Sequence, residues 1–93
     1  MSDRDLDTLF TLEELARLCA VEREWVIRHV EDGLLVTAGT VERQFTPAAL
    51  VRARRMRQLE RDFDAVPELA ALMADLLEEL DAMRAEMRRR GFS

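Results

Sequence analysis

The chain has no tyrosine and no lysine, and it has only one histidine, one tryptophan and one cysteine. Histidine and cysteine supply many catalytic bases, nucleophiles and metal ligands, so His29 and Cys19 alone are a poor basis for a catalytic or zinc site. The favoured interpretation is that Cys19 is a small core residue and His29 a helix-surface residue, rather than a nucleophile pair. A lone cysteine also forms no internal disulfide, which fits a reducing compartment. We therefore expect no catalytic site, cofactor or metal.

Long apolar runs are missing as well, and the three glycines and two prolines are scattered. No stretch reaches the roughly 18 apolar residues that a membrane-spanning helix needs, and the N-terminus Met-Ser-Asp-Arg-Asp is not a basic leader followed by an apolar segment. Scattered glycines also exclude a glycine-rich phosphate loop. We expect a single small cytoplasmic domain, whose 93 residues leave little core and favour oligomerisation or a partner.

Charge is abundant in the chain, and it is arranged in bands. Acidic side chains dominate residues 1–32 and 63–86, whereas arginines dominate 47–62 and 87–93, and the formal net charge is -5. This net charge argues against indiscriminate binding to a phosphate backbone. The arginines of 47–62 are the strongest feature in favour of nucleic acid, but a solvated helix face that pairs with the acidic N-terminal helices explains them equally well. They are Arg52, Arg54, Arg55, Arg57 and Arg61.

The first third of the chain predicts a helix-turn-helix. Thr11 and Glu14 have the pattern of a capping box, in which each side chain bonds the other residue's backbone N–H, so a helix begins there. Apolar residues at three- and four-residue spacing continue this short amphipathic helix to about Cys19. Residues 22–32 predict a second helix, with Gly33 as its left-handed terminator. Two short helices joined by about three residues make the motif.

A small β-hairpin, or wing, and a third helix are expected next. Leu34–Val36 and Val41–Phe45 flank Gly39 with β-branched and aromatic residues, as the strands of a hairpin do. The pair Thr46-Pro47 then has the N-cap and first-position pattern of a helix start, and this helix extends to about Asp62.

A long amphipathic helix is predicted for the C-terminal part of the chain. Its apolar positions alternate three- and four-residue intervals without a break, which is the pattern of a coiled-coil seam. The seam consists of Val66, Leu69, Met73, Leu76, Leu80, Met83 and Met87. We expect its first turns to pack on the domain and the later ones on a second chain, unless the helix folds back in an intramolecular bundle. The expected dimerisation residues are Leu76, Leu80, Met83 and Met87. Residues 1–63 are then the winged helix-turn-helix domain, and 64–93 the long helix.

The surface of the second predicted helix is acidic. Within residues 22–32 four acids outnumber two arginines, so this surface repels a polyanion and forfeits the counterion release that drives binding to DNA. Trp25 is expected half exposed at the edge of the core, either as an interface anchor or as a filler of space beneath the wing. The helix that stands where a DNA-reading helix belongs is therefore poorly suited to DNA.

Two sets of motifs resemble known families. Leu12-Glu-Glu-Leu-Ala-Arg-Leu-Cys, Val30-Glu-Asp-Gly-Leu-Leu and Gln44-Phe-Thr before a basic helix resemble the MerR superfamily, whose element order matches the whole chain. Arg55-Met-Arg-Gln-Leu-Glu-Arg-Asp-Phe, followed by residues 69–84, is similar to the end of the chaperone-modulator family CbpM, which the chain also matches in size. The expected fold class is mainly α, a MerR-like winged helix-turn-helix with a small β-hairpin wing and a long C-terminal coiled-coil helix.

The CbpM resemblance implies a non-enzymatic protein of the bacterial cytoplasm. Such a protein binds the J-domain of a DnaJ-like co-chaperone, CbpA, and blocks its stimulation of DnaK. J-domains commonly present a basic helix, and an acidic partner surface is complementary to it in charge. MerR proteins that bind DNA typically carry Arg-Tyr-Tyr where this chain has Ile27-Arg28-His29, and a proline in the region of Val36-Thr37. The candidate contact residues are Glu24, Trp25, Arg28, Glu31 and Asp32.

The alternative is a small MerR-type transcription regulator. In that case the second helix and the wing read DNA while arginines contact phosphates. The candidate arginines are Arg43, Arg52, Arg54 and Arg55. A third possibility is a dimerisation module with another protein partner.

Overall fold

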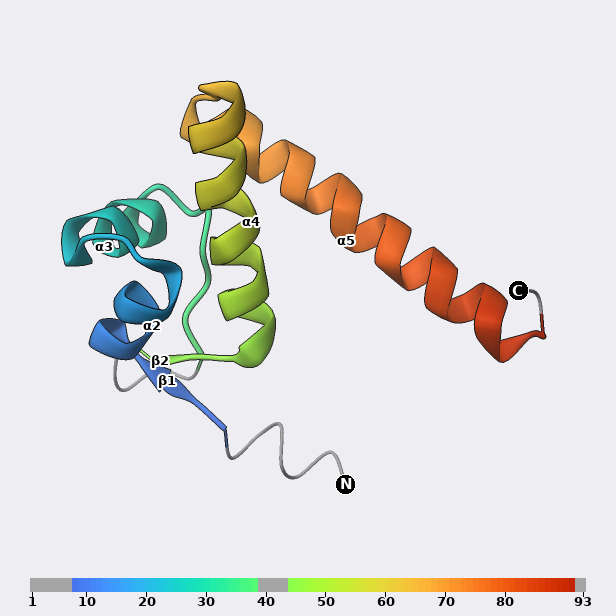
Figure 1. The fold of residues 1–93 in the computed structure, drawn as a ribbon. Helices are drawn as coiled ribbons and strands as arrows, with labels where there is room; N and C mark the ends of the chain where they lie inside the picture. Colours follow the sequence, from blue (N-terminus) through green and yellow to red (C-terminus); the bar gives the residue numbers. More distant parts are fainter. Residues whose placement is uncertain (1–7, 39–43, 92–93) are drawn as a thin grey trace.

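A computed structural model describes residues 8–38 and 44–91 of the chain. The described part is mainly helical, with one small antiparallel strand pair and a long C-terminal helix (Figure 1). In chain order the elements are β1 (Phe10–Thr11), α2 (Leu12–Cys19), α3 (Arg23–Glu31), β2 (Gln44–Phe45), α4 (Pro47–Phe63) and α5 (Pro67–Arg89). The expected fold class, a winged helix-turn-helix followed by a long helix, is confirmed. None of the described helices is both long and apolar enough to cross a membrane.

Local capping sets the ends of the helices in the helix-turn-helix. The Glu14 N–H donates to the Thr11 hydroxyl over 3.1 Å, and the Thr11 N–H donates to a Glu14 carboxylate oxygen over 2.8 Å, which is the predicted capping box. Ala20, at φ 57°, ends α2 in the left-handed conformation, and Gly33 adopts the predicted left-handed conformation after α3. The connection between α2 and α3 is therefore as short as expected.

The wing differs in part from the predicted hairpin. Ala38 and Gln44 form an antiparallel bridge at its base, but Leu34–Val36 adopts no strand. That segment contributes to the core instead, because Leu35 is only 2% exposed. The predicted turn at 39–43 lies outside the described residues.

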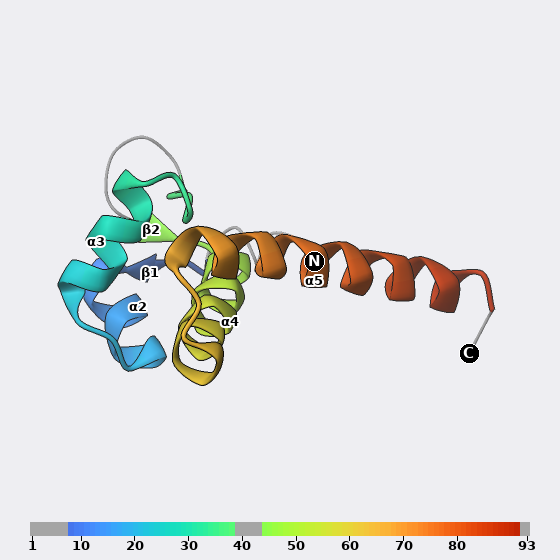
Figure 2. The same cartoon turned by 90° about the horizontal axis from the view of Figure 1, so that it is seen from above.

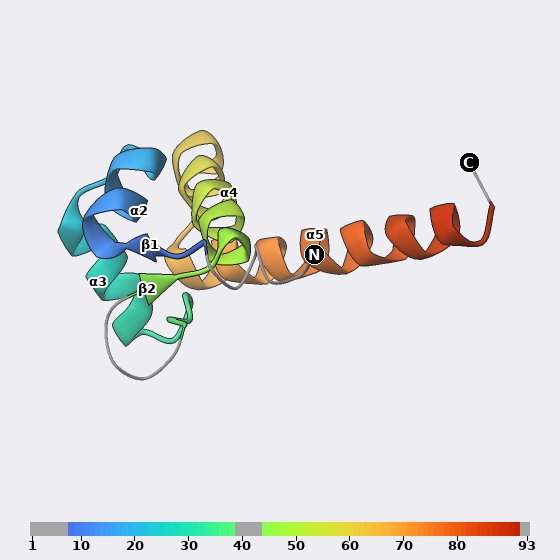
Figure 3. The ribbon, with the colours of Figure 1, turned by 90° about the horizontal axis from the view of Figure 1, so that it is seen from below.

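The core lies where α2, α3 and α4 meet the strand pair and the first turns of α5. β2 pairs antiparallel with β1, so that Phe45 lies opposite Phe10, and Phe45, Leu15 and Met56 are fully buried. The two helices of the helix-turn-helix lie on one side of α4, and α5 leaves on the other (Figures 2 and 3). As a result, α4 lies between α3 and α5.

α5 packs on α4 through small side chains. Ala70, Ala71 and Ala74 are buried, and side chains of this size allow two helices to approach closely. Beyond them α5 projects away from the other helices, so that its C-terminal end stands clear of α4 (Figures 1 and 2). The alternative of an intramolecular bundle is therefore wrong for this chain.

The first turns of α5 pack on the domain, as expected, but through Ala70, Ala71 and Ala74, whereas the coiled-coil seam is exposed along most of its length. Leu69 near the start is 47% exposed and Leu76 is 60% exposed. Each residue advances the helix by about 100°, which centres the buried alanines about 140° around α5 from the seam. The residues predicted for dimerisation are all exposed, namely Leu76, Leu80, Met83 and Met87.

Candidate functional site

The outer surface of α3 carries the charged residues that sequence reasoning selected. Glu24, Arg28 and Glu31 follow one another at four- and three-residue spacing, so they share one face of the helix. All three are exposed, as is Asp32 directly after the helix. Arg23 adds little positive charge here, because its Nε lies 3.2 Å from Glu13 Oε2 on α2. The exposed face of α3 is therefore acidic overall.

Trp25 lies behind this face and is tied to α4. Its indole N–H donates to Glu60 Oε1 over 3.1 Å, and its ring stacks on His29 with the ring centroids 3.7 Å apart and the planes 22° from parallel. It is half-buried, as expected. Glu60 is 13 residues after Pro47, the first residue of α4, about 20 Å along the helix. Trp25 thus packs against the last turns of α4 rather than filling space beneath the wing.

His29 is buried, which corrects its interpretation as a helix-surface residue. Only 3% of the residue is exposed. Its Nδ1–H donates to the Trp25 carbonyl oxygen, and Nε2 lies 2.7 Å from Glu60 Oε2. Because a carbonyl oxygen only accepts, Nδ1 carries the hydrogen of that bond, and Nε2 is paired with the Glu60 carboxyl group. Helical spacing contained a signal for this placement, since His29 follows inward-facing Val26 by three residues.

Cys19 and His29 do not form a nucleophile pair. Both nitrogens of His29 are occupied by Trp25 and Glu60. Cys19 is buried in the core, as expected, and burial raises the pKa of its thiol, although Arg54 and Arg57 partly offset the effect. A reactive thiol needs a lowered pKa, so the chemistry of Cys19 is that of an inert core residue.

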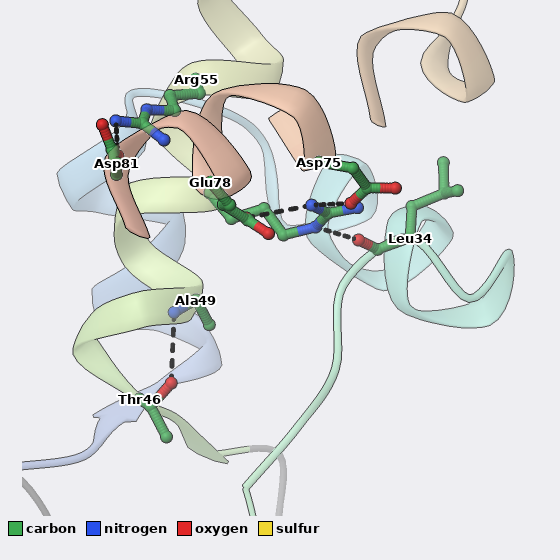
Figure 4. A network of polar contacts seen from close by, with 8 residues as sticks. Leu34, Thr46, Ala49, Arg55, Asp75, Glu78 and Asp81 are labelled. Atoms are coloured by element: carbon green, nitrogen blue, oxygen red, sulfur yellow. Dashed lines mark hydrogen bonds and ion pairs between the residues drawn. The ribbon is translucent and has the colours of Figure 1, made fainter. Parts of the chain in front are cut away.

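Two arginines of α4 form ion pairs with acids of α5. Arg52 lies 2.7 Å from Asp75 and 3.0 Å from Glu78, and Arg55 lies 2.6 Å from Asp81. Figure 4 shows these acids of α5 beside α4, together with the Leu34 carbonyl, which accepts from Arg52 over 2.8 Å. Burial lowers the pKa of Arg52, but its bonds to the two acids raise it above its ordinary value. These arginines therefore pair with α5 and not with the N-terminal helices.

The remaining arginines proposed for DNA differ from these two. Arg54 is exposed on α4, on the side away from Arg52 and Arg55, and Arg43 lies outside the described residues. Within residues 8–38 and 44–91 no three His, Cys, Asp or Glu side chains are grouped so that they could hold a metal ion. The structure thus has two exposed surfaces on opposite sides of α4, the acidic face of α3 and the apolar seam of α5.

Comparison with known proteins identifies a family for this chain. No curated protein and no solved structure matches the chain. The family model described as MerR HTH family regulatory protein matches residues 10–89, from β1 to the last turn of α5. Because this match spans every described element, the chain belongs to the MerR HTH family of regulatory proteins.

Proposed function

We propose that this protein is a non-enzymatic chaperone modulator that binds the J-domain of a DnaJ-like co-chaperone of the CbpA type and prevents it from stimulating DnaK. The observation that carries the proposal is the acidic, exposed face of α3, where a DNA-binding relative presents its reading helix. The resemblance of residues 55–63 and 69–84 to the CbpM family supports the same partner.

The charge of α3 selects the kind of partner. Four acids and two arginines occupy residues 22–32, and one of these arginines is paired with Glu13. A phosphate backbone is repelled by such a surface, whereas a basic protein helix is attracted and docks faster. Glu24, Arg28, Glu31 and Asp32 are the direct contacts in this proposal. Trp25 contributes its exposed edge while its indole N–H stays bonded to Glu60.

The apolar seam of α5 supports a dimer of this modulator. Monomeric soluble proteins rarely expose a long contiguous apolar stripe, and the seam leads away from the rest of the molecule (Figure 1). Antiparallel pairing puts the two winged helix-turn-helix domains at opposite ends of the paired helices, where they leave each other room. We therefore propose an antiparallel dimer through the seam from Leu69 to Met87, which includes Leu76, Leu80 and Met83.

A DNA-binding regulator is the second candidate. Membership of a family described as helix-turn-helix regulators favours it, and Arg54 is exposed and free of ion pairs with the described acids. A gel-shift experiment with the DNA upstream of the protein's own gene tests it. A sequence-dependent shift that disappears as salt is raised is the result that favours this candidate.

An ATPase assay tests the proposed function. With DnaK and the J-domain co-chaperone of the same organism, excess protein is expected to return the ATPase rate close to its unstimulated value. Reversing charge with Glu24→Arg and Glu31→Arg is expected to weaken inhibition about tenfold, because two attractive pairs become repulsive. Glu68→Arg with Glu79→Arg on α5 is the matched control and should inhibit as the wild type does. Full stimulation at every concentration of the wild-type protein is the result that rejects the proposal.

A further inference from the structure

A second charged surface, opposite in sign to the face of α3, lies between α2 and α4. It is an open groove of about 360 Å³ whose one wall is the end of α2, Leu18 to Ala20. The other wall is α4, which contributes Arg54, Arg57 and Arg61 along with Gln58 and Asp62. The three arginines follow one another at three- and four-residue spacing and so share a face of α4. We call this surface the arginine groove.

The positive charges of the three arginines in the groove are not neutralised by acids of the described residues. No carboxylate of the described residues lies within ion-pair distance of Arg54, Arg57 or Arg61. Arg57 uses its Nε–H to bond the Ala20 carbonyl over 3.1 Å, which leaves the other four N–H groups of its guanidinium. The chain has 19 acids against 14 arginines, yet these three arginines stand together with no ion-pair partner among the described acids. The groove is thus poised for an anionic group from outside.

Arginines on the other face of α4 differ from those of the groove, because they are paired with acids. There Arg52 and Arg55 are neutralised by three acids of α5. On the groove side α2 ends instead in apolar residues, of which Cys19 is 4% exposed and Leu18 half-buried. A ligand that fits both walls has carboxylates for the guanidiniums and an apolar side chain for the end of α2.

We propose that the arginine groove binds an acidic peptide segment of a partner protein, with interspersed apolar residues. A continuous polyanion fits less well, because Glu22 stands two residues beyond Ala20 and Asp62 lines the groove itself. Discrete carboxylates reach single guanidiniums without passing these acids. The inference stands apart from the function proposed for α3, because the two surfaces differ in residues and in sign.

Fluorescence anisotropy tests the groove with a fluorescein-labelled peptide of repeated Glu-Asp-Leu units at low ionic strength. Wild-type protein is expected to bind it, and Arg54→Glu with Arg61→Glu to bind it at least about tenfold more weakly, because two charge-assisted contacts are lost. Neither side chain makes a hydrogen bond or ion pair within the described residues, so far-UV circular dichroism should show an unchanged fold. Arg84→Glu with Arg88→Glu on α5 is the matched control and should bind as the wild type does.

Three results overturn the inference. The first is no anisotropy change with wild-type protein, and the second is equal weakening in the α5 control, which means general attraction only. The third is tighter binding of labelled oligo(dT) with the same dependence on Arg54 and Arg61, which makes the groove a nucleic-acid surface. None of these results bears on J-domain binding by α3.

Discussion

Replacing Glu60 with alanine is expected to lower the free energy of unfolding by about 3 kcal/mol. Glu60 accepts from the Trp25 indole N–H and from His29 Nε2, and His29 is almost wholly buried. Without the carboxylate, the buried His29 ring and the Trp25 indole N–H lose their hydrogen-bond partner, and α3 loses these polar contacts with α4. Urea unfolding followed by far-UV circular dichroism measures the loss, and the emission of Trp25, the chain's only tryptophan, should change as well.

Glu79→Ala is the matched control for Glu60→Ala. Glu79 is an exposed acid on α5, so its removal is expected to change the free energy of unfolding by less than about 0.5 kcal/mol. Glu60→Gln keeps an acceptor but not the charge and should fall between the two. A Glu60→Ala protein as stable as the control would contradict the role of Glu60 as the partner that stabilises buried His29.

Placing charges in the seam of α5 is expected to abolish the proposed dimer. Leu76→Glu with Leu80→Glu puts two carboxylates of each chain into the interface, where desolvation and mutual repulsion are expected to weaken association at least about a hundredfold. Sedimentation at several protein concentrations should show dimers for the wild type and monomers for the variant. Ala82→Glu adds a charge on an exposed position outside the seam and should stay dimeric. A wild-type protein that is monomeric at every concentration contradicts the prediction.

Cysteine cross-linking distinguishes the direction of the two helices. In an antiparallel pair Leu69 of one chain lies near Met87 of the other, whereas two Leu69 residues are about 27 Å apart along the axis, too far for a disulfide. A mixture of Leu69→Cys and Met87→Cys proteins should therefore form mixed disulfides, and Leu69→Cys alone should not. Native Cys19 is buried and stays out of the reaction. Disulfides within the Leu69→Cys protein alone indicate a parallel pair.

Helix boundaries could be predicted from the sequence because the signals that end a helix are local. The capping box of Thr11 and Glu14, the left-handed Gly33 and the Thr46-Pro47 start all act within a few residues, and the structure has each of them. The acidic face of α3 was equally readable, because charged side chains on a short amphipathic helix remain at its surface. Local chemistry thus sufficed for the scaffold and for the position of the candidate site.

The parts that could not be predicted depend on contacts between distant residues. Nothing next to His29 in the sequence indicates that this polar residue is buried. Its burial is favourable because Glu60 on α4, 31 residues away, pairs with its ring. β1 has two residues and therefore no pattern of its own. The pairing of Arg52 with α5 depends on the direction in which α5 leaves α4, which follows from the small size of Ala70 and Ala74. For each of these residues the local sequence allows several environments, and contacts with residues far away in the chain decide which one forms.

A calorimetric titration tests the central claim, that the face of α3 binds a basic J-domain surface, most directly. The J-domain of the organism's own DnaJ-like co-chaperone is titrated at low ionic strength into the wild type, the Glu24→Arg with Glu31→Arg protein and the Glu68→Arg with Glu79→Arg control. We expect a dissociation constant of about 1 μM or lower for the wild type and the control, and at least about tenfold weaker binding for the α3 variant. No heat with the wild type, or equal affinity of all three proteins, contradicts the account.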